Sequence, residues 1–480
     1  MTGAAMFREV VSRGYRAVLV DKGDFAGGTS QASGMLAWGG LLYMRNLEFG
    51  TVRKLCRARD DWISEGTDEV QVAPFRYLPL KKGGRSSSFV RLALETYWHL
   101  GGRRRSRPFR DQSSHPFLHQ GRFQAGLAYE EAAMVQSDAR VTLDWILGAR
   151  AEHAHAWNHC ALEAADWQDG HWQVRLHDRR SDSPRSLRAK ALVNAAGVWA
   201  DGVADMAAIQ TEHRHALSKG VYLVVQRPKG LDQYLAFEMG EHGDTLTLTP
   251  WGPAALWGPT ETLVESIDGG FQPDGNDVRF LLDQAARNLS TPLKPHDVLS
   301  LRCGIRPLAV KKNHRATKYP LDLSRKHAID VDRAKRAITL FGGKFTSSGA
   351  LAARAADRLE RLVGAPRGVG GAGSRGAPGK APRPHRPTNF CFADHQARWI
   401  DPAFARDQEA CWLLVDYLRR RTSIAQWTPR LGLGAGDSHL DEISRLAEVI
   451  EGDRGSLAVE GLRAAANLQD ETLECAFMRS

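Results

Sequence analysis

The sequence predicts an α/β fold with a small α-helical domain at its C-terminal end, and three observations lead to this prediction. Helix and strand patterns alternate through most of the 480 residues, as in domains where helices cover a mainly parallel sheet. The chain opens on a short helix, an apolar strand and an acid, which is the second half of a dinucleotide-binding βαβ unit. Residues 404–425 and 438–467 repeat apolar side chains at helical spacing, which predicts two amphipathic helices.

The composition is that of an ordinary soluble globular protein. Apolar residues make up 42% and charged residues 25% of the chain, and no stretch approaches the ~20 apolar residues of a membrane span. The six cysteines form no CxxC pair and no metal-ligand spacing, which indicates reduced thiols. We therefore expect a cytoplasmic protein with two or three domains.

The first helix is predicted to end near Arg13, with Gly14 just after its end, and a buried strand follows over residues 15–20. Asp21 closes this strand, where an acid can accept hydrogen bonds from the ribose hydroxyls of an adenosine. Gly3 lies 18 residues earlier, which suits the third glycine of G-x-G-x-x-G. A surface Asp after a strand is equally consistent with these residues alone.

The segment after this strand, "GDFAGGTSQASGMLAWGGLLY", is rich in glycine. Thr29, Ser30 and Ser33 are expected at a helix N-terminus, where small and hydroxyl residues let the backbone approach a phosphate or a flat ring. A merely structural glycine-rich loop is the alternative.

Two further strand–turn–helix segments carry small residues at the turn. The strand 191–193 runs into Asn194-Ala195-Ala196-Gly197, with a helix from about Val198. The strand 337–341 is followed by a Gly-Gly turn and a helix from Thr346, capped by Thr346 or Ser347. The free N–H groups and positive dipole end of that second helix would stabilise negative charge on a ligand.

Taken in this order, the segments resemble the FAD-dependent glycerol-3-phosphate dehydrogenases of the D-amino-acid-oxidase superfamily. The resemblance covers nearly the whole chain and rests on "VDKGDFAGGTS", "WGGLLY", "QSDAR", "LVNAAGVWAD", "SKGVYLVV", "WGPTET", "CGIRPL", "FGGKFTS" and the tail "DYLRRRTSIAQW". It implies an FAD-binding, Rossmann-like domain of the glutathione-reductase type, interleaved with an antiparallel-sheet substrate domain and followed by a helical C-terminal domain.

The resemblance also implies domain boundaries and a cofactor site. The FAD-binding domain would take residues 1–80, 136–215 and 298–363, and the substrate domain 81–135 and 216–297. Residues 364–387, rich in Gly and Pro, would be a flexible linker before a helical domain at 388–480. The FAD contacts expected from the motifs are Gly3, Asp21, Lys22, Thr29, Ser30, Ser33, Trp38, Gly39, Gly40, Ala196, Gly197, Gly343, Lys344, Phe345 and Thr346.

For the reaction, the resemblance implies that Arg306 and Lys344 anchor a small anionic substrate while hydride passes from a hydroxyl-bearing carbon to the flavin. Tyr222 and Glu261 are the expected proton acceptors, and a quinone or oxygen would take the electrons. The family's substrate-phosphate Arg is Leu42 here, its preceding His is Trp38, and a family Lys is Met35. An amine or amino-acid oxidase on the same scaffold is the alternative.

The family begins with a strand followed by Gly-x-Gly-x-x-Gly, and Met1-Thr2-Gly3 aligns with the end of that motif. We therefore expect the first strand and two glycines to be missing. We interpret this as a start codon assigned too far downstream. The alternative is a truncated, non-catalytic relic that binds little flavin.

Basic residues concentrate in one segment. Residues 81–122 hold ten Lys and Arg against Glu95 and Asp111, so this segment carries +8 of the net +10. It contains no recognisable nucleic-acid module, so we expect no nucleic-acid partner. Two interpretations stay open: a solvated basic loop, and a peripheral contact with anionic lipid at the inner face of the cytoplasmic membrane.

Two clusters of polar residues are predicted to be structural. His153, His155, His159 and Cys160 lie where the family has a pair of strands, and no carboxylate partner is evident in the sequence, so we expect no metal site. The arginines at 419–421 are expected to be a mixture of solvated and domain-interface charges.

Overall fold

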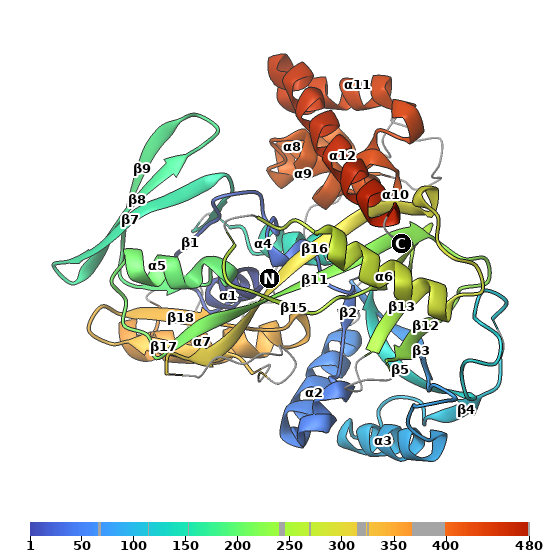
Figure 1. The fold of residues 1–480 in the computed structure, drawn as a ribbon. Helices are drawn as coiled ribbons and strands as arrows, with labels where there is room; N and C mark the ends of the chain where they lie inside the picture. Colours follow the sequence, from blue (N-terminus) through green and yellow to red (C-terminus); the bar gives the residue numbers. More distant parts are fainter. Residues whose placement is uncertain are drawn as a thin grey trace.

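The computed structural model describes residues 1–65, 69–113, 115–151, 153–239, 245–267, 270–313, 323, 326–366 and 399–478. Three regions are visible in Figure 1: a layered α/β region, a large sheet flanked by helices, and a helical C-terminal region. This arrangement confirms the predicted combination of an α/β region, an antiparallel-sheet region and a helical tail.

The α/β region contains a parallel layer that is divided into two pieces. Its elements are α1 (Thr2–Ser12), β1 (Ala17–Val20), α4 (Asp138–Gly148), β6 (Ala154–Trp157), β10 (Leu192–Asn194), β17 (Ala328–Asp332), β18 (Ala337–Phe341) and α7 (Ser348–Val363). One piece is β1 parallel to β6, and the other is β10 parallel to β18, with β17 antiparallel on the far side of β18. Helices α1, α4 and α7 pack together on one face, around a shared apolar core.

A small antiparallel sheet and a short helix extend from the α/β region, as Figure 1 shows at its upper left. They are β7 (Cys160–Gln168), β8 (His171–Asp178), β9 (Ser183–Ala189) and α5 (Ala200–Met206). Trp172, which is fully buried, packs with Ala204 and Ile209 and so joins the sheet to α5.

The second region is a ten-stranded sheet in which β3 and β12 are parallel and the other neighbouring strands are antiparallel. Its strands are β2 (Leu36–Ala37), β3 (Val70–Leu78), β4 (Phe109–Asp111), β5 (Gly126–Met134), β11 (His213–Gln226), β12 (Tyr234–Glu238), β13 (Thr245–Trp251), β14 (Ala254–Gly258), β15 (Thr262–Val264) and β16 (Val298–Lys311). Helices α2 (Phe49–Ser64), α3 (Ser87–Leu100) and α6 (Gly275–Asn288) flank this sheet. Its long strands β11 and β16 also reach the α/β region, so the two regions share one continuous backbone framework.

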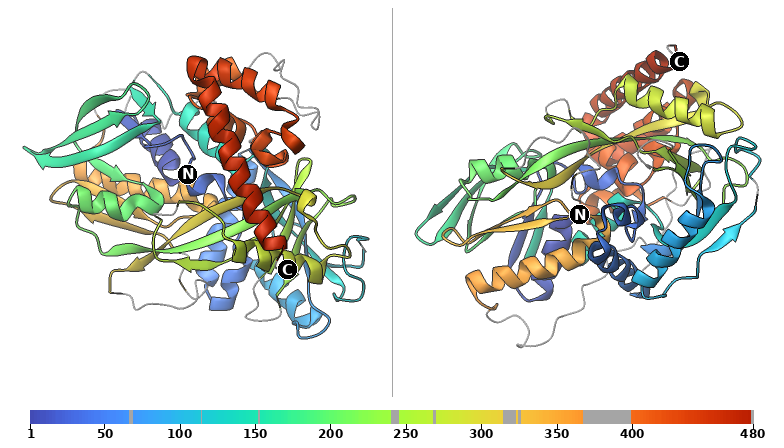
Figure 2. Two further views of the ribbon diagram at one scale, coloured as in Figure 1. Left: turned by 45° about the horizontal axis from the view of Figure 1, so that its top comes forward. Right: turned by 60° about the horizontal axis from the view of Figure 1, so that its bottom comes forward.

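The C-terminal region is helical but is more broken than the sequence predicts. It comprises α8 (Pro402–Glu409), α9 (Leu414–Asp416), a π-helical turn (Tyr417–Arg421), α10 (Ile424–Trp427), α11 (Leu440–Glu451) and α12 (Gly455–Phe477). The single helix expected over 404–425 is wrong, because Ala410 ends α8 in a left-handed conformation with φ +53°. Helix α12 runs back to α6, as the two views of Figure 2 show, and its Leu473 and Ala476 join the core of the large sheet.

Several local predictions are confirmed. Helix α1 ends at Ser12 and Gly14 has φ +88°, while β18 spans the predicted residues. On α7, Ala352, Ala355 and Leu359 repeat at helical spacing and form a buried apolar face.

One local prediction near the Gly-rich segments is wrong, and another is confirmed only in part. Thr29–Gln31 form only a 3₁₀ turn, because the Thr29 hydroxyl and the Ser33 amide bond to distant segments. Ser347 is the N-cap residue of α7, but its side chain makes no capping hydrogen bond, and the Thr346 hydroxyl donates to the Trp38 carbonyl.

The predicted domain boundaries stay a prediction. Both β3 and β16 lie inside the predicted FAD-binding ranges, yet each belongs to the large sheet. Of the predicted linker, 367–387 falls outside the described residues. In the part of the chain that the structure describes, no helix is long and apolar enough to cross a bilayer, and Cys56, Cys160, Cys303, Cys411 and Cys475 are free thiols.

Candidate active site

One large cavity of about 2610 Å³ connects the α/β region with the large sheet. Most of the residues predicted from sequence motifs line it, although they come from segments far apart in the chain. These residues are Gly3, Asp21, Lys22, Thr29, Ser30, Ser33, Trp38, Ala196, Gly197, Tyr222, Glu261, Arg306, Gly343, Lys344, Phe345 and Thr346. The structure therefore brings together the separate motifs around a single space.

Gly39 and Gly40 are not among the lining residues. The Gly39 amide donates to Glu131 Oε2 at 3.0 Å, and a Cβ on Gly39 would lie 2.0 Å from the Tyr97 hydroxyl. Gly40 has φ +85°, which favours glycine. These two glycines let the chain turn closely against α2 and α3.

One end of the cavity lies beside the carboxyl end of β1. Asp21 follows this strand, and its carboxylate accepts a hydrogen bond from the Gly23 amide at 3.1 Å. Burial raises the pKa of Asp21 to about 6. The Lys22 ammonium lies 4.0 Å from the centre of the Trp199 ring. An acid in this place can accept hydrogen bonds from a ligand's hydroxyl groups.

The glycine-rich segment follows along the wall, and long-range bonds hold it in place. The Thr29 hydroxyl donates to the Ile305 carbonyl at 2.6 Å, and the Ser33 amide donates to Asp138 Oδ2 at 2.7 Å. Asp138 is itself paired with Arg302 at 2.6 Å, and both side chains are fully buried. The sequence did not predict that this buried pair holds the glycine-rich segment in place; Asp138 lies in the motif "QSDAR", but the motif does not indicate its partner. The Ser30 hydroxyl accepts from the Met1 amino group at 2.7 Å beside the cavity.

The other end of the cavity is formed by the start of α7 and by the aromatic residues opposite it. The Lys344 ammonium lies 3.9 Å from the centre of the Tyr43 ring, and the Tyr43 and Trp38 rings are 5.7 Å apart. Gly343 precedes Lys344 with φ +125°, a conformation open to glycine. A cation and two aromatic rings therefore meet at this end.

Arg306, Glu261 and Tyr222 lie along the adjoining wall, on or beside the long strands β11 and β16. Arg306 Nη1 lies 3.1 Å from Glu261 Oε2, and the Ser218 hydroxyl donates to Glu261 Oε1 at 2.6 Å. A Cβ on Gly220 would lie 2.2 Å from Arg306 Nη2, so glycine makes room for the guanidinium. Burial raises the pKa of the Tyr222 hydroxyl, which therefore stays protonated at neutral pH.

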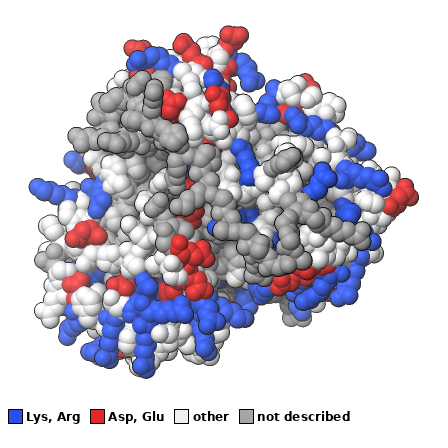
Figure 3. Space-filling view, turned by 180° about the vertical axis from the view of Figure 1, so that it is seen from behind, with Lys and Arg blue, Asp and Glu red and all other residues white. Residues whose placement is uncertain are grey.

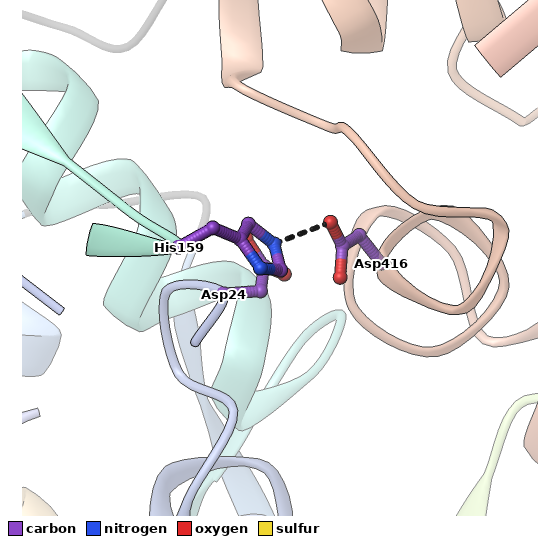
Figure 4. A group of neighbouring side chains, drawn as sticks. All are labelled: Asp24, His159 and Asp416. Carbon is purple, nitrogen blue, oxygen red and sulfur yellow. Dashed lines mark hydrogen bonds and ion pairs between the residues drawn. The ribbon is translucent and has the colours of Figure 1, made fainter. Parts of the chain in front are cut away.

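A separate acidic cluster lies where the C-terminal region meets the α/β region. Figure 4 shows His159 pointing toward Asp416, with Asp24 beside them, and one ligand atom of each lies within 4.8 Å of the others. His159 Nε2 lies 2.9 Å from Asp416 Oδ2. The absence of a carboxylate partner for His159, expected from the sequence, is therefore wrong.

This cluster is nevertheless already neutralised by arginines. Arg420 Nε and Arg421 Nη1 lie 2.5 and 2.6 Å from Asp24 Oδ2, and all three side chains are buried. Burial alone would raise the pKa of Asp24, but the guanidinium groups of Arg421 and Arg420 outweigh it and hold that pKa well below its usual range. Arg420 and Arg421 are therefore the interface charges of the predicted mixture of solvated and domain-interface arginines. Their charges join the two regions and leave Asp24 no free charge for a metal ion.

The cavity fits an FAD molecule in its extent and in its donor set. An acid stands at the strand end, glycine and hydroxyl residues follow, and the 3₁₀ turn that precedes α7 (Phe345–Ser347) lines the cavity through Phe345 and Thr346. Its volume exceeds the roughly 300–1,000 Å³ of ordinary ligand pockets, as a long dinucleotide requires.

Comparison with known proteins agrees with this geometry. D-erythritol 1-phosphate dehydrogenase of Brucella abortus (strain 2308) is 30% identical over 374 residues, covering 75% of this chain and 72% of that protein. Glycerol-3-phosphate dehydrogenase of Mycobacterium leprae (strain TN) is 28% identical over 377 residues, covering 76% of this chain and 62% of that protein. The chain thus spans less than two thirds of the mycobacterial enzyme.

A solved structure shares the whole fold. The glycerol-3-phosphate dehydrogenase from Bacillus halodurans, complexed with FAD, superposes with a TM-score of 0.70 at 18% identity, covering 98% of this chain and 92% of that one. A family model described as FAD dependent oxidoreductase matches residues 1–359. The resemblance inferred from the motifs is confirmed, and the chain belongs to the family of FAD-dependent oxidoreductases.

Proposed function

We propose that this protein is an FAD-dependent dehydrogenase that oxidises a hydroxyl-bearing carbon of a small phosphorylated polyol. The observation that carries this proposal is the pair of cations, Arg306 and Lys344, on the walls of a cavity whose opposite end presents Asp21. Both cations line the cavity, where they can contact an anionic group of a bound substrate.

The two ends of the cavity would bind different parts of FAD. At the Asp21 end, the carboxylate would accept hydrogen bonds from ribose hydroxyls, and Ser30 would lie along the phosphates. At the α7 end, the N–H groups of Phe345 and Thr346 would face the flavin's pyrimidine ring. FAD supplies the hydride acceptor, while the chain supplies orientation and charge.

Arg306 and Lys344 would hold the substrate's anionic group in different ways. Arg306 is oriented by Glu261 and by the space above Gly220, so its planar fork is fixed before the substrate arrives. Lys344 offers a point charge beside the Tyr43 ring. A fixed fork and a point charge together suit a phosphate better than a neutral alcohol.

Glu261 is a better proton acceptor for the substrate hydroxyl than Tyr222. The raised pKa of Tyr222 keeps its hydroxyl protonated, so it can donate a hydrogen bond but is a poor base. Glu261 accepts a hydrogen bond from the Ser218 hydroxyl and lines the cavity. Replacing Glu261 with Gln should lower kcat and move the pH profile of kcat, whereas Tyr222→Phe should leave the shape of that profile unchanged.

Two chain lengths are proposed for the polyol. Leu42 lines the cavity where the resemblance places a phosphate-binding Arg, and one relative is named an erythritol phosphate dehydrogenase. Glycerol 3-phosphate and tetritol phosphates are therefore both proposed substrates. Leu42 and Trp38 favour the alternative of an amine or amino-acid oxidase.

A visible spectrum and a substrate panel separate these functions. We expect a yellow protein once FAD is added, and anaerobic bleaching by phosphorylated polyols but not by amino acids or glycerol. Bleaching by an amino acid alone would establish the oxidase, and failure to retain any flavin would establish a non-catalytic relic. Reoxidation by a soluble quinone or by oxygen would then identify the electron acceptor.

We also propose that the basic segment contacts anionic lipid. Figure 3 shows Lys and Arg gathered at the lower left of the face drawn, the side of the molecule where α2 and α3 lie. Apolar side chains stand among these charges: Phe89 is 56%, Leu92 67% and Phe109 58% exposed. Such a mixture suits shallow, charge-assisted binding at the lipid surface.

Co-sedimentation with acidic vesicles would test this contact. The protein should pellet at low salt and be released at high salt, because the attraction is screened. A Phe89→Ser/Leu92→Ser variant should pellet less, while Val415→Ser, an exposed apolar residue of the C-terminal region, should pellet as the parent does. No pelleting at low salt would leave the solvated-loop interpretation.

A further inference from the structure

Strand β11 carries two histidines, His213 and His215, and each is paired with an aspartate through the same two groups. His213 Nδ1 lies 2.7 Å from Asp330 Oδ1, and the His213 amide donates to Asp330 Oδ2 at 2.9 Å. His215 Nδ1 lies 3.0 Å from Asp201 Oδ2, and the His215 amide donates to the same oxygen at 3.1 Å. Residues two apart in a strand point to the same side, and both rings lie beside Phe341, the last residue of β18. The two pairs are therefore alike on the Nδ1 side of the ring.

The two histidines differ at Nε2. Within the described residues, His213 makes no hydrogen bond to the segment after β18, whereas His215 Nε2 accepts one from the Gly342 amide at 3.1 Å. A carboxylate only accepts hydrogen bonds, so the proton of the His215 ring is on Nδ1, toward Asp201, and Nε2 is left as an acceptor. The His215 side chain is 1% exposed, so water does not compete for this bond. Asp201 of α5 thus sets the tautomer with which His215 holds Gly342.

Gly342 begins the turn that connects β18 to Lys344. Gly342 has φ +68° and Gly343 has φ +125°, so both lie where glycine is favoured. All three residues line the large cavity, and the Lys344 ammonium lies 3.9 Å from the centre of the Tyr43 ring. Because two successive glycines leave the backbone many conformations, a bond from the turn to the buried His215 ring restricts where the Lys344 side chain begins.

We propose that His215 is a positioning residue for Lys344, and that it acts by fixing the Gly342–Gly343 turn. The inference rests on the proposed function, in which Lys344 contacts the anionic group of the substrate. When the turn is fixed, the ammonium lies beside Tyr43 before the substrate binds, and less binding energy is spent on ordering it. His213 has the same carboxylate pairing without the bond to the turn, so it does not share this role.

Two substitutions separate the two bonds of the His215 ring. Asn carries an amide near the position of Nδ1 and can still donate to Asp201, but its side chain is too short to reach Gly342. Gln is one carbon longer and can place its carbonyl oxygen near the position of Nε2, where it can accept from Gly342. His213→Asn is the matched control, because it makes the same change at the other histidine of the strand.

Amide hydrogen exchange in the full chain supplemented with FAD tests the bond itself. Exchange at Gly342 should be roughly tenfold faster or more in His215→Asn, and it should return toward the parental rate in His215→Gln. His213→Asn should leave the exchange rate of Gly342 as it is in the parent. Equal exchange at Gly342 in the parent and in His215→Asn would overturn the proposal.

Stopped-flow reduction of the flavin by a phosphorylated polyol tests whether this bond acts through Lys344. In FAD-saturated protein His215→Asn should lower kcat/KM roughly tenfold, and His215→Gln should recover part of that loss. In the Lys344→Met background, the same His215→Asn change should alter kcat/KM by less than about twofold, because the group that His215 positions is gone.

The outcomes separate this inference from the function on which it rests. An equal loss of kcat/KM from His215→Asn in both backgrounds, or an equal loss in His213→Asn, would show a structural role for His215 and overturn only the positioning inference. No reduction of the parental flavin by any phosphorylated polyol would overturn the proposed function, and the positioning inference with it.

Discussion

Asp21 and Asp24 lie three residues apart on the same loop, but their surroundings shift the pKa values of the two carboxyl groups in opposite directions. Asp24 is 3% exposed and is held by two arginines from the C-terminal region, which keep its pKa well below the usual range. Asp21 faces the cavity, and burial raises its pKa to about 6 because the Gly23 amide and distant charges compensate only in part. The Asp21 side chain lines the cavity, so a ligand in the cavity can contact it.

The difference shows how a structural charge is distinguished from a ligand-binding one. The partners of Asp24 belong to the chain, so its charge contributes to docking of the C-terminal region. The ionised form of Asp21 is poorly compensated by the chain, which is the pattern of a group that awaits a ligand.

The largest effect is expected at the interface. Asp24→Asn would remove the carboxylate that Arg420 and Arg421 share, leaving Arg420 only Asp416 and Arg421 only Glu409 at 3.9 Å as acidic partners in the described chain, and breaking a buried pair typically costs about 3–5 kcal/mol. The free energy of unfolding in urea should fall by that amount. Asp407→Asn, at an exposed acid paired with Arg406, is the matched control and should leave the free energy of unfolding nearly unchanged. Equal losses in the two variants would contradict the structural role of Asp24.

At the opposite end of the cavity, Lys344→Met should lower kcat/KM by roughly one to three powers of ten, since ~1.5–4 kcal/mol of charge stabilisation is lost. The FAD content of the variant should be measured first, so that a binding defect is separated from a catalytic one. Flavin reduction at the parental rate on the best substrate would contradict the assignment of Lys344 to the anion site.

Asp21→Asn should have the opposite sign from Asp24→Asn. The folded state favours protonated Asp21, so the stability from this group is fully present below its ordinary pKa of 3.8 and is lost as the pH rises through about 6. At pH 7 without FAD, the neutral Asn should therefore stabilise the fold by about 1–3 kcal/mol, and it should flatten the fall in stability between pH 4 and 6.

The same Asp21→Asn change should weaken FAD binding, measured by fluorescence titration, because a carboxylate that accepts ribose hydroxyls is lost. A variant that gains stability and loses FAD affinity would sharpen the contrast. A variant that loses both would show that Asp21 is structural, like Asp24.

The smallest effect is expected at Leu42. Leu42→Arg should raise kcat/KM for glycerol 3-phosphate about tenfold, since a charge-assisted contact is worth roughly 1.5–3 kcal/mol and part of that is spent on ordering the side chain. Asn46→Arg adds the same charge on the same 3₁₀ turn and should change kcat/KM less. Similar gains in both variants would indicate general attraction of anions rather than a specific contact.

The sequence predicted the elements whose patterns are local. Strand β18 and the buried face of α7 follow from apolar residues at strand and helix spacing, and the motifs identified most of the cavity wall. The bonds that decide the polar network span long separations and leave no local pattern. The contact from Thr29 to Ile305 spans 276 residues, and that from Arg421 to Asp24 spans 397.

These long-range bonds explain what the sequence did not predict. In the Thr29–Ser33 segment the Thr29 hydroxyl and the Ser33 amide donate hydrogen bonds to a distant strand and a distant helix, so the segment forms a 3₁₀ turn where a helix was expected. Interface charges were predicted for the arginine triplet, but its partner Asp24 lies 397 residues from Arg421 and could not be identified from the sequence. In the same way, Glu131 fixes Gly39 against α3, although the motif predicted a flavin contact.

Anaerobic stopped-flow reduction of the FAD-supplemented protein tests whether this protein oxidises a phosphorylated polyol. We predict saturable bleaching of the flavin by glycerol 3-phosphate or a tetritol phosphate, slowed tenfold or more by Lys344→Met, and no bleaching by glycerol. Equal rates with glycerol and glycerol 3-phosphate, or reduction by an amino acid alone, would contradict the account.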